Sequence, residues 1–369
     1  ALGAVMVLFS LTGGFDLGAG TLLPFVAKSD DERRVVVNTV GPTWDGNQVW
    51  LVIIGAGIFA LFPRAYAVSF TGFYFAMLIV LWALFMRPVS FEYRSKFMKQ
   101  SSRTFWDWAL FVGSVVPAII FGVAMGNLLL GSPFSFDPMS LRVDYTGTFF
   151  GLLQPFAVLC GLLSLAMFVM HGAVYLLLRC DGVVYERSRK AAMIFSLIFL
   201  ALYTIIGIIL LFGLNGYHVD ALPKNPSTHP LASTVSVYRG AWVTNYFQHP
   251  WMMIAPLMGF LGAILTYKAA KKEQRVKCFF MSTLCILGAV SSIGFSLFPF
   301  LMPSSTYPDQ SLLIWNSSSS RISLIGILIV AAISLPVIFV YTNFVYRKLW
   351  GRGQRMSEKV IAEQRHTLY

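Results

Sequence analysis

Charged residues are scarce in this chain: Asp, Glu, Lys and Arg together make up 12% of its 369 residues. Because a soluble domain carries about 25%, about half of the expected charge is absent, and this excludes a string of soluble domains despite the length. Apolar residues take the place of the charges, at 57% of the chain. They recur in stretches of about 20 residues, the length that crosses the apolar core of a bilayer. The composition therefore predicts an integral membrane protein.

Cysteine and histidine, the usual soft metal ligands, are also few, at four and five residues. The cysteines lack the CxxC spacing of a metal knuckle and show no disulfide framework. The histidines lack the HxxxH or HxxE spacing of zinc sites. His171 alone lies clearly inside an apolar run, where a packed, hydrogen-bonded side chain is the expectation. No nucleophile triad, phosphate-binding loop or dinucleotide motif is present, so we predict neither catalytic residues nor metal ligands in this chain.

The net charge of +12 raises the question of a nucleic-acid partner. The basic residues, however, lie between the apolar runs, where they orient helices and meet anionic lipid headgroups. No basic stripe interleaved with aromatic residues is present. The sequence therefore predicts no nucleic-acid partner.

Nine apolar segments follow one another along the chain. They cover about residues 1–27, 47–63, 66–86, 107–130, 149–178, 191–213, 251–268, 278–301 and 322–346. They lack alternation of period two and exceed the roughly 9–11 residues of a barrel strand, which favours helices. The turn at Phe62-Pro63-Arg64 is short enough to predict a tight helical hairpin. We therefore predict an all-α integral membrane fold of about nine transmembrane helices, in which residues 1–369 form a single polytopic domain that starts within its first helix.

The Lys and Arg residues gather on one side of the predicted bundle. When successive connections are assigned alternately to two sides, 23 of these residues fall on one side and 5 on the other. Since Lys and Arg accumulate in cytoplasmic loops, the C-terminal tail is predicted in the cytoplasm and the N-terminus outside. Adding or removing one helix would scramble this alternation, which supports an odd number.

Asp16 lies in an apolar run and is flanked by Gly14 and Gly18, which permit close helix packing. An ionisable group at membrane depth is costly and is a functional candidate by default. Two interpretations stay open for this carboxyl. It either ties neighbouring helices together through hydrogen bonds or handles protons.

The stretch from Trp44 to Trp50 is the densest cluster of polar and aromatic residues. If it begins the second helix, Asp45 and Gln48 share one face, and Asn47 and Trp50 share another. The two tryptophans suit a membrane interface. Asp45 is either a first-turn carboxylate favoured by the helix dipole or a carboxylate at the cytoplasmic mouth of a proton path.

Further polar residues flank the third and fourth segments. Arg87-Pro88 is expected to end the third helix. Glu92 follows on the cytoplasmic side, either as an ion-pair partner among basic residues or as a carboxylate that leads protons inward. Asp107 stands between two tryptophans and is expected in the first turn of the fourth helix.

In this order and spacing, the motifs of the chain resemble subunit II of the cytochrome bd-type quinol oxidases. The resemblance covers essentially the full length. The matching motifs are Gly14-Phe15-Asp16-Leu17-Gly18, Asp31-Glu32-Arg33-Arg34, Trp44 to Trp50, Gly72-Phe73-Tyr74, Phe85-Met86-Arg87-Pro88, Tyr93-Arg94-Ser95-Lys96, Gly126-Asn127-Leu128-Leu129 and Phe298-Pro299-Phe300-Leu301-Met302-Pro303-Ser304-Ser305. Each motif is weak alone, and their order is specific.

The resemblance implies two four-helix bundles with one peripheral helix, in a heterodimer with a larger subunit I of similar fold. That partner would carry the hemes, two of b type and one of d type. The complex would oxidise ubiquinol at the outer face of a bacterial inner membrane and reduce O₂ to water with cytoplasmic protons. Small single-helix accessory subunits, and a ubiquinone in a lipid-facing groove of this chain, are further expectations.

The resemblance also implies that this chain supports heme assembly and offers a proton route. Carried over by motif, the candidates for that route are Asp16, Asp45 and Glu92, with Gln48 one turn deeper than Asp45. The candidates for an interface or structural role are Trp44, Asn47, Trp50 and Arg87.

This chain departs from the family pattern at two positions. Many relatives have Asp where this chain has Glu92, and an additional Asp where it has Gly13. The change at Glu92 keeps the carboxyl, and the change at Gly13 removes one carboxyl from the entrance of the implied proton route.

Two alternatives to a proton-conducting oxidase subunit stay open: a secondary transporter with buried carboxylates, or a purely structural subunit.

Overall fold

The computed structural model describes residues 2–97, 99–220, 229, 231, 233–350 and 355–363. Within these residues, nine helices are long and apolar enough to cross a membrane. The helices that form these spans are α1 (Leu2–Val26), α3 (Trp44–Leu61), α5 (Tyr74–Tyr93), α6 (Gln100–Leu130), α7 (Pro155–Arg179), α8 (Val183–Ile208), α10 (Ile254–Lys271), α11 (Arg275–Leu297) and α13 (Arg321–Trp350). The predicted all-α membrane fold is confirmed.

Short elements connect the spans. The short α-helices are α2 (Asp30–Val40), α4 (Pro63–Gly72), α9 (Thr244–Gln248), α12 (Ile314–Ser317) and α14 (Glu358–Glu363). Single turns of other helix types are η1 (Arg94–Lys96), η2 (Phe150–Leu152), η3 (Ile209–Gly213), η4 (Ala241–Val243), η5 (Pro250–Met253) and η6 (Pro308–Gln310). The strands are β1 (Phe134–Phe136), β2 (Val143–Tyr145), β3 (Asn215–Val219), β4 (Val235–Arg239), β5 (Phe300–Met302) and β6 (Leu312–Leu313), in three antiparallel hairpins.

Several predicted helix boundaries are wrong, and those around the third and fourth segments matter most for the site. The third predicted segment is split at Phe73 into α4 and α5, and α5 continues past Arg87-Pro88 as far as Tyr93. A proline lacks only one backbone donor, and the turn around it stays helical because Arg87, Ser90 and Phe91 are buried against neighbouring helices. The fourth spanning helix begins at Gln100. Asp107 therefore lies about two turns inside α6 rather than in its first turn.

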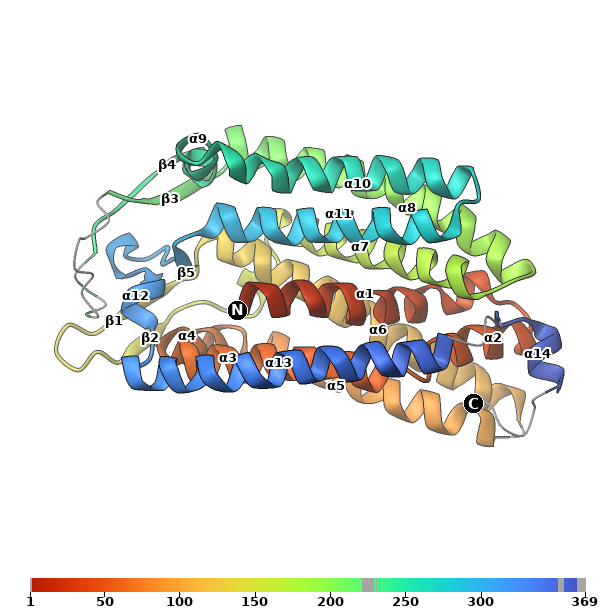
Figure 1. Ribbon diagram of the computed structural model, residues 1–369. Coiled ribbons are helices and arrows are strands. Elements are labelled where there is room, and N and C mark those ends of the chain that lie inside the picture. Colours follow the sequence, from red (N-terminus) through yellow and green to blue (C-terminus); the bar gives the residue numbers. More distant parts are fainter. Residues whose placement is uncertain are drawn as a thin grey trace.

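The spanning helices run side by side along one axis (Figure 1). The first group contains α1, α3, α5 and α6, the second contains α7, α8, α10 and α11, and α1 and α6 both pack against α7. Gly18 of α1 and Gly172 of α7 explain how closely the groups approach, because a Cβ at either glycine would collide with the facing backbone. The glycines around Asp16 thus bring its helix into the centre of the molecule.

The peripheral helix α13 lies along one edge of the bundle, next to α3 and opposite α10 (Figure 1). None of the apolar window of α13 is buried inside the chain, and only 11% of that of α3 is. Their outward surfaces are apolar, and the outward surface of α5 is rich in aromatic residues. The two four-helix groups and a ninth, peripheral helix agree with the predicted arrangement.

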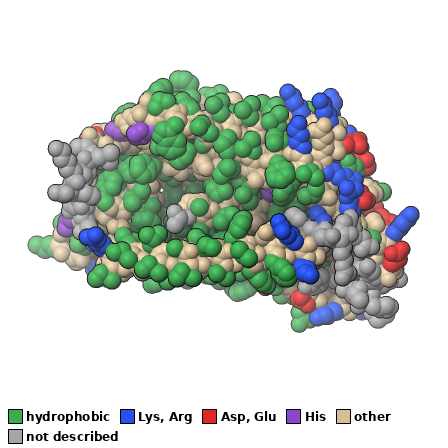
Figure 2. All heavy atoms as spheres, in the orientation of Figure 1, with side chains coloured by type: hydrophobic (Ala, Val, Ile, Leu, Met, Phe, Trp, Pro, Cys, Tyr) green, Lys and Arg blue, Asp and Glu red, His purple; other side chains and the backbone are tan. Residues whose placement is uncertain are grey.

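The two ends of the bundle differ in chemistry. At one end, here called the basic end, α2 and α14 lie beside the helix ends at Arg179 and Lys271, and Lys and Arg side chains gather (Figure 2). At the other, the hairpin end, the three β-hairpins meet. The motif around Ser304 closes the hairpin end, since its hydroxyl donates to the carbonyl of Phe134 at 2.5 Å and Pro303 accepts from the amide of Ser132 at 2.8 Å.

Candidate functional site: a buried polar cluster near the basic end

Five polar side chains from four helices meet inside the first helix group. We call them the polar cluster: Asp16, Asn47, Gln48, Arg87 and Tyr346. Asp16 of α1 is 1% exposed, and one of its oxygens accepts a hydrogen bond from the amide nitrogen of Asn47 at 2.7 Å. The amide oxygen of Asn47 accepts one from the hydroxyl of Tyr346 at 2.7 Å. A chain of hydrogen bonds therefore runs from the peripheral helix to the carboxyl of Asp16.

Arg87 brings a positive charge to the same place. Arg87 is 1% exposed, and its guanidinium donates to the side-chain oxygen of Gln48 at 2.9 Å and attracts the carboxylate of Asp16 electrostatically. Four buried atoms of the cluster have no hydrogen-bond partner among the described residues: Asp16 Oδ1, Gln48 Nε2, and Arg87 Nε and Nη2. Buried polar atoms are almost always satisfied by protein or water. Four unpartnered polar atoms in one cluster are thus unusual for a purely structural core.

The structure divides the Trp44–Trp50 stretch as the spacing predicts. Asn47 and Trp50 are buried on the inner face of α3, whereas Asp45 is exposed and Gln48 is half-buried. Asp45 stands in the first turn of α3, as predicted. Trp44 stacks on Phe91 with ring centroids 5.3 Å apart. Among the described residues, no hydrogen bond or ion pair joins Asp45 to Asp16.

Glu92 also stands apart from the polar cluster. Its side chain is 50% exposed and lies 3.8 Å from the ammonium of Lys96, one turn further along the chain. This is the surface ion pair that the basic surroundings of Glu92 favour. Of the four proton-route candidates, the structure therefore brings Asp16 and Gln48 into one cluster and leaves Asp45 and Glu92 on the surface of this chain.

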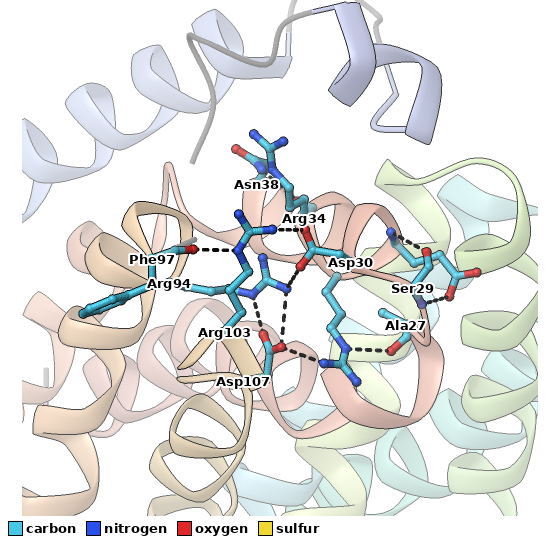
Figure 3. A network of polar contacts seen from close by, with 11 residues as sticks. Ala27, Ser29, Asp30, Arg34, Asn38, Arg94, Phe97, Arg103 and Asp107 are labelled. Atoms are coloured by element: carbon cyan, nitrogen blue, oxygen red, sulfur yellow. Dashed lines mark hydrogen bonds and ion pairs between the residues drawn. The ribbon is translucent and has the colours of Figure 1, made fainter. Parts of the chain in front are cut away.

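A second polar assembly, the ion network, lies at the basic end and was missed in the sequence. It consists of Asp30, Arg33, Arg94, Arg103 and Asp107 (Figure 3). Asp107 is 1% exposed and contacts the guanidinium groups of Arg94 at 2.5 Å and Arg33 at 2.9 Å. Asp30 pairs with Arg94 and Arg103, each at 2.8 Å. The network ties α2 to the ends of α5 and α6.

Glu32 fixes the start of α2 from the other side. Its carboxylate accepts from the backbone amide of Lys28 at 2.5 Å and from the guanidinium of Arg187 at 2.7 Å, and Ser29 completes a capping box with it. Burial alone would raise the pKa of Glu32. The hydrogen bonds from Lys28, Arg187 and Ser29 outweigh burial and hold this pKa below its usual range.

His171 is not arranged as a free axial ligand for a heme. It is fully buried in α7; one ring nitrogen lies 2.8 Å from the hydroxyl of Ser282 and the other 3.1 Å from the carbonyl of Leu11. Its ring also stacks on Phe279 at 5.3 Å. Both nitrogens are thus engaged, as expected for a packed histidine. Among the described residues, no group of three or more His, Cys, Asp or Glu is placed to hold a metal ion.

Fold and site together define the class of protein: a helical membrane protein, with nine candidate spans in its described residues and a carboxyl and a guanidinium buried together between the helices. Comparison with known proteins narrows that class. The family model "Cytochrome bd terminal oxidase subunit II" matches residues 1–349. The chain belongs to this family.

Individual relatives agree over nearly full length. The chain is 42% identical to a probable cytochrome oxidase subunit 2 of Haemophilus influenzae, over 99% of this chain and 96% of that protein. It is 39% identical to the cytochrome bd-I ubiquinol oxidase subunit 2 of Escherichia coli K12, over 100% of this chain and 96% of that protein. In the solved bd oxidase of Geobacillus thermodenitrificans, one chain superposes with a TM-score of 0.69 at 16% identity, covering 95% of this chain and 96% of that chain, which supports the fold.

Family membership carries several consequences. The chain is one subunit of an oxidoreductase complex that contains hemes, and a subunit I is its partner. As a multi-span protein of a bacterial bd oxidase, it lies in the inner membrane. This membership disfavours the secondary transporter that the buried carboxylate alone left open.

Proposed function

We propose that this chain is the subunit of a cytochrome bd quinol:O₂ oxidoreductase that binds no heme itself and handles cytoplasmic protons at the polar cluster. The hemes, of b and d type, belong on the larger subunit I in this proposal. The engaged ring nitrogens of His171 support that assignment. The chain would in addition support heme assembly in its partner by providing the surface against which subunit I folds.

The polar cluster carries the proposal. A carboxyl that serves only to tie helices together would be expected to have both oxygens satisfied. Asp16 instead keeps one buried oxygen with no partner in the part of the chain that the structure describes, and nitrogens of Arg87 and Gln48 likewise have none there. Such atoms can be satisfied by water or by a polar group of a partner chain. These atoms support the proposal that Asp16 exchanges a proton with water beside the charge of Arg87.

The outward surface of α3 and α5 is the proposed docking face for subunit I. Its exposed residues include Phe75, Trp82 and Phe85, each more than half exposed, and large aromatic residues are enriched in protein interfaces. Asp45 lies on the exposed part of α3 near the basic end. A charged side chain at membrane depth is costly in lipid, so a partner is the better neighbour for it. Asp45 would then join the proton route only in the assembled complex.

The orientation of the chain and its small partners complete the proposal. The basic end, with the C-terminal tail, faces the cytoplasm and the N-terminus faces the periplasm. A shallow, open depression of about 470 Å³ lies between α3 and α13 and is lined by Ala60, Ser319, Ser323, Gly326, Ile327 and Val330. In this proposal, a lipid or ubiquinone would lie against this mostly apolar surface. Single-helix accessory subunits would pack on the outside of the complex.

Two experiments test the proposal. A reduced-minus-oxidised spectrum of the purified complex should show d-type heme, and the isolated chain should bind no heme; stoichiometric heme on this chain alone contradicts the assignment. The Asp16→Asn complex should keep its heme spectrum and consume oxygen more slowly, with an altered pH profile. Full turnover with an unchanged profile would show that Asp16 only holds helices together.

A further inference from the structure

Tyr346 belongs to the peripheral helix but reaches the interior of the first helix group. The apolar window of α13 is entirely unburied within this chain, so this helix adds little to the core. The hydroxyl of Tyr346 nevertheless donates to Asn47 Oδ1 at 2.7 Å, and Asn47 Nδ2 donates to Asp16 Oδ2 at 2.7 Å. One phenol and one amide thus connect the outermost helix to the buried carboxyl.

The chemistry of the three groups restricts how they can be arranged. A charged carboxylate only accepts hydrogen bonds, so Asn47 must turn its NH₂ towards the charged Asp16. A proton taken up at Oδ1, the oxygen of Asp16 without a partner among the described residues, leaves Oδ2 as a carbonyl oxygen that still accepts from Asn47. The amide of Asn47 therefore keeps one orientation in both protonation states, provided that its own oxygen has a donor. The hydroxyl of Tyr346 is that donor.

We propose that Tyr346 is a positioning residue for proton handling at Asp16. Its hydroxyl holds the Asn47 amide with nitrogen towards the charged carboxylate. When Asp16 takes up a proton from water at Oδ1, the amide keeps donating to Oδ2. No covalent bond changes in the amide or the phenol. This inference rests on the proposed proton role of Asp16 and adds a residue that none of the sequence motifs contains.

Titratable and charged groups also stand on the helices packed around α1, and most are engaged elsewhere. From α7, His171 is hydrogen-bonded at both nitrogens, and the hydroxyl of Tyr175 donates to the carbonyl of Thr39. From α5, Arg87 contributes a positive charge. From α6, Asp107 is committed to the ion network. From α11, Cys278 and Cys285 are buried thiols. The hydrogen-bonded connection of Tyr346 to Asp16 through Asn47 therefore distinguishes it within this set.

The test compares Tyr346→Phe with Tyr341→Phe in the purified, heme-containing complex. Tyr341 lies on the same helix and is 66% exposed, so it controls for the loss of a hydroxyl from α13. We expect Tyr346→Phe to keep the heme spectrum, to lower quinol-driven oxygen consumption roughly fivefold, and to displace the midpoint of the pH profile by roughly half a unit to one unit. Tyr341→Phe should match the unsubstituted complex in both respects.

Asp16→Asn separates the inference from the proposed function. If Asp16→Asn leaves turnover and pH profile unchanged, the proton role of Asp16 is refuted, and the role of Tyr346 falls with it. If Asp16→Asn alters the profile but Tyr346→Phe does not, only the role of Tyr346 is refuted. Should Tyr346→Phe lose its hemes, Asn47→Leu breaks the same link from the other side. An unchanged pH profile in that variant also overturns the inference.

Discussion

Replacing Asp107 by asparagine should destabilise the basic end of the bundle. Asp107 is 1% exposed and lies against Arg94, whose side chain is 2% exposed, and against Arg33, at 17%. The substitution keeps the shape and removes the negative charge, so two nearly buried guanidinium groups lose their closest counter-charge. Breaking a buried ion pair from one side costs about 3–5 kcal/mol. Asp30 still faces Arg94 at 2.8 Å and keeps part of the ion pairing. We therefore expect the free energy of unfolding to fall by about 3 kcal/mol.

The four buried cysteines supply the assay, because a thiol-reactive dye reaches them only when the helices separate. The unfolding midpoint of Asp107→Asn should fall well below that of the unsubstituted complex. Glu92→Gln is the matched control. It removes a carboxylate from an exposed pair at 3.8 Å, and such pairs contribute about 0–1 kcal/mol. The Arg94→Gln, Asp107→Asn double variant should lose less than the sum of the two single losses. Equal midpoints for Asp107→Asn and Glu92→Gln would refute the assignment of stability to the ion network.

Three further predictions concern the basic end. The pKa of Glu32 is held below its ordinary value of 4.5, so its charged form adds stability that is fully present above that pH and is lost as the pH falls through the depressed pKa. The unfolding temperature of Glu32→Gln should therefore fall less steeply with acidification than that of the unsubstituted complex. An equally steep fall would contradict this prediction. Asp45→Asn should slow oxygen consumption while the subunits stay associated, and full heme content with full turnover and an unchanged pH profile would leave Asp45 as a helix-start residue only. A cysteine placed at Ser357, just before α14, should resist membrane-impermeant reagents in intact cells, and ready labelling would reverse the proposed orientation.

Much of the membrane architecture follows from the sequence alone. A bilayer core accepts only segments that satisfy their own backbone hydrogen bonds, so the scarcity of charge and the long apolar runs already require helices. The inward face of Asn47 and Trp50 also follows from helical spacing, as does the exposed ion pair of Glu92 with Lys96. These are local properties, set by residues within a turn or two of one another.

Only the tertiary structure decided which distant residues meet. Tyr346 stands 299 positions from Asn47, and nothing in the apolar sequence of its helix distinguishes it from Tyr341. Asp107 has the sequence context of a helix start, and it became the centre of a buried ion network because α2 carries Arg33 across to it. The helix likewise continues through Pro88 because neighbouring helices bury Arg87 and Phe91. Local rules fix where a chain can be helical, and packing between helices decides which polar groups are buried together.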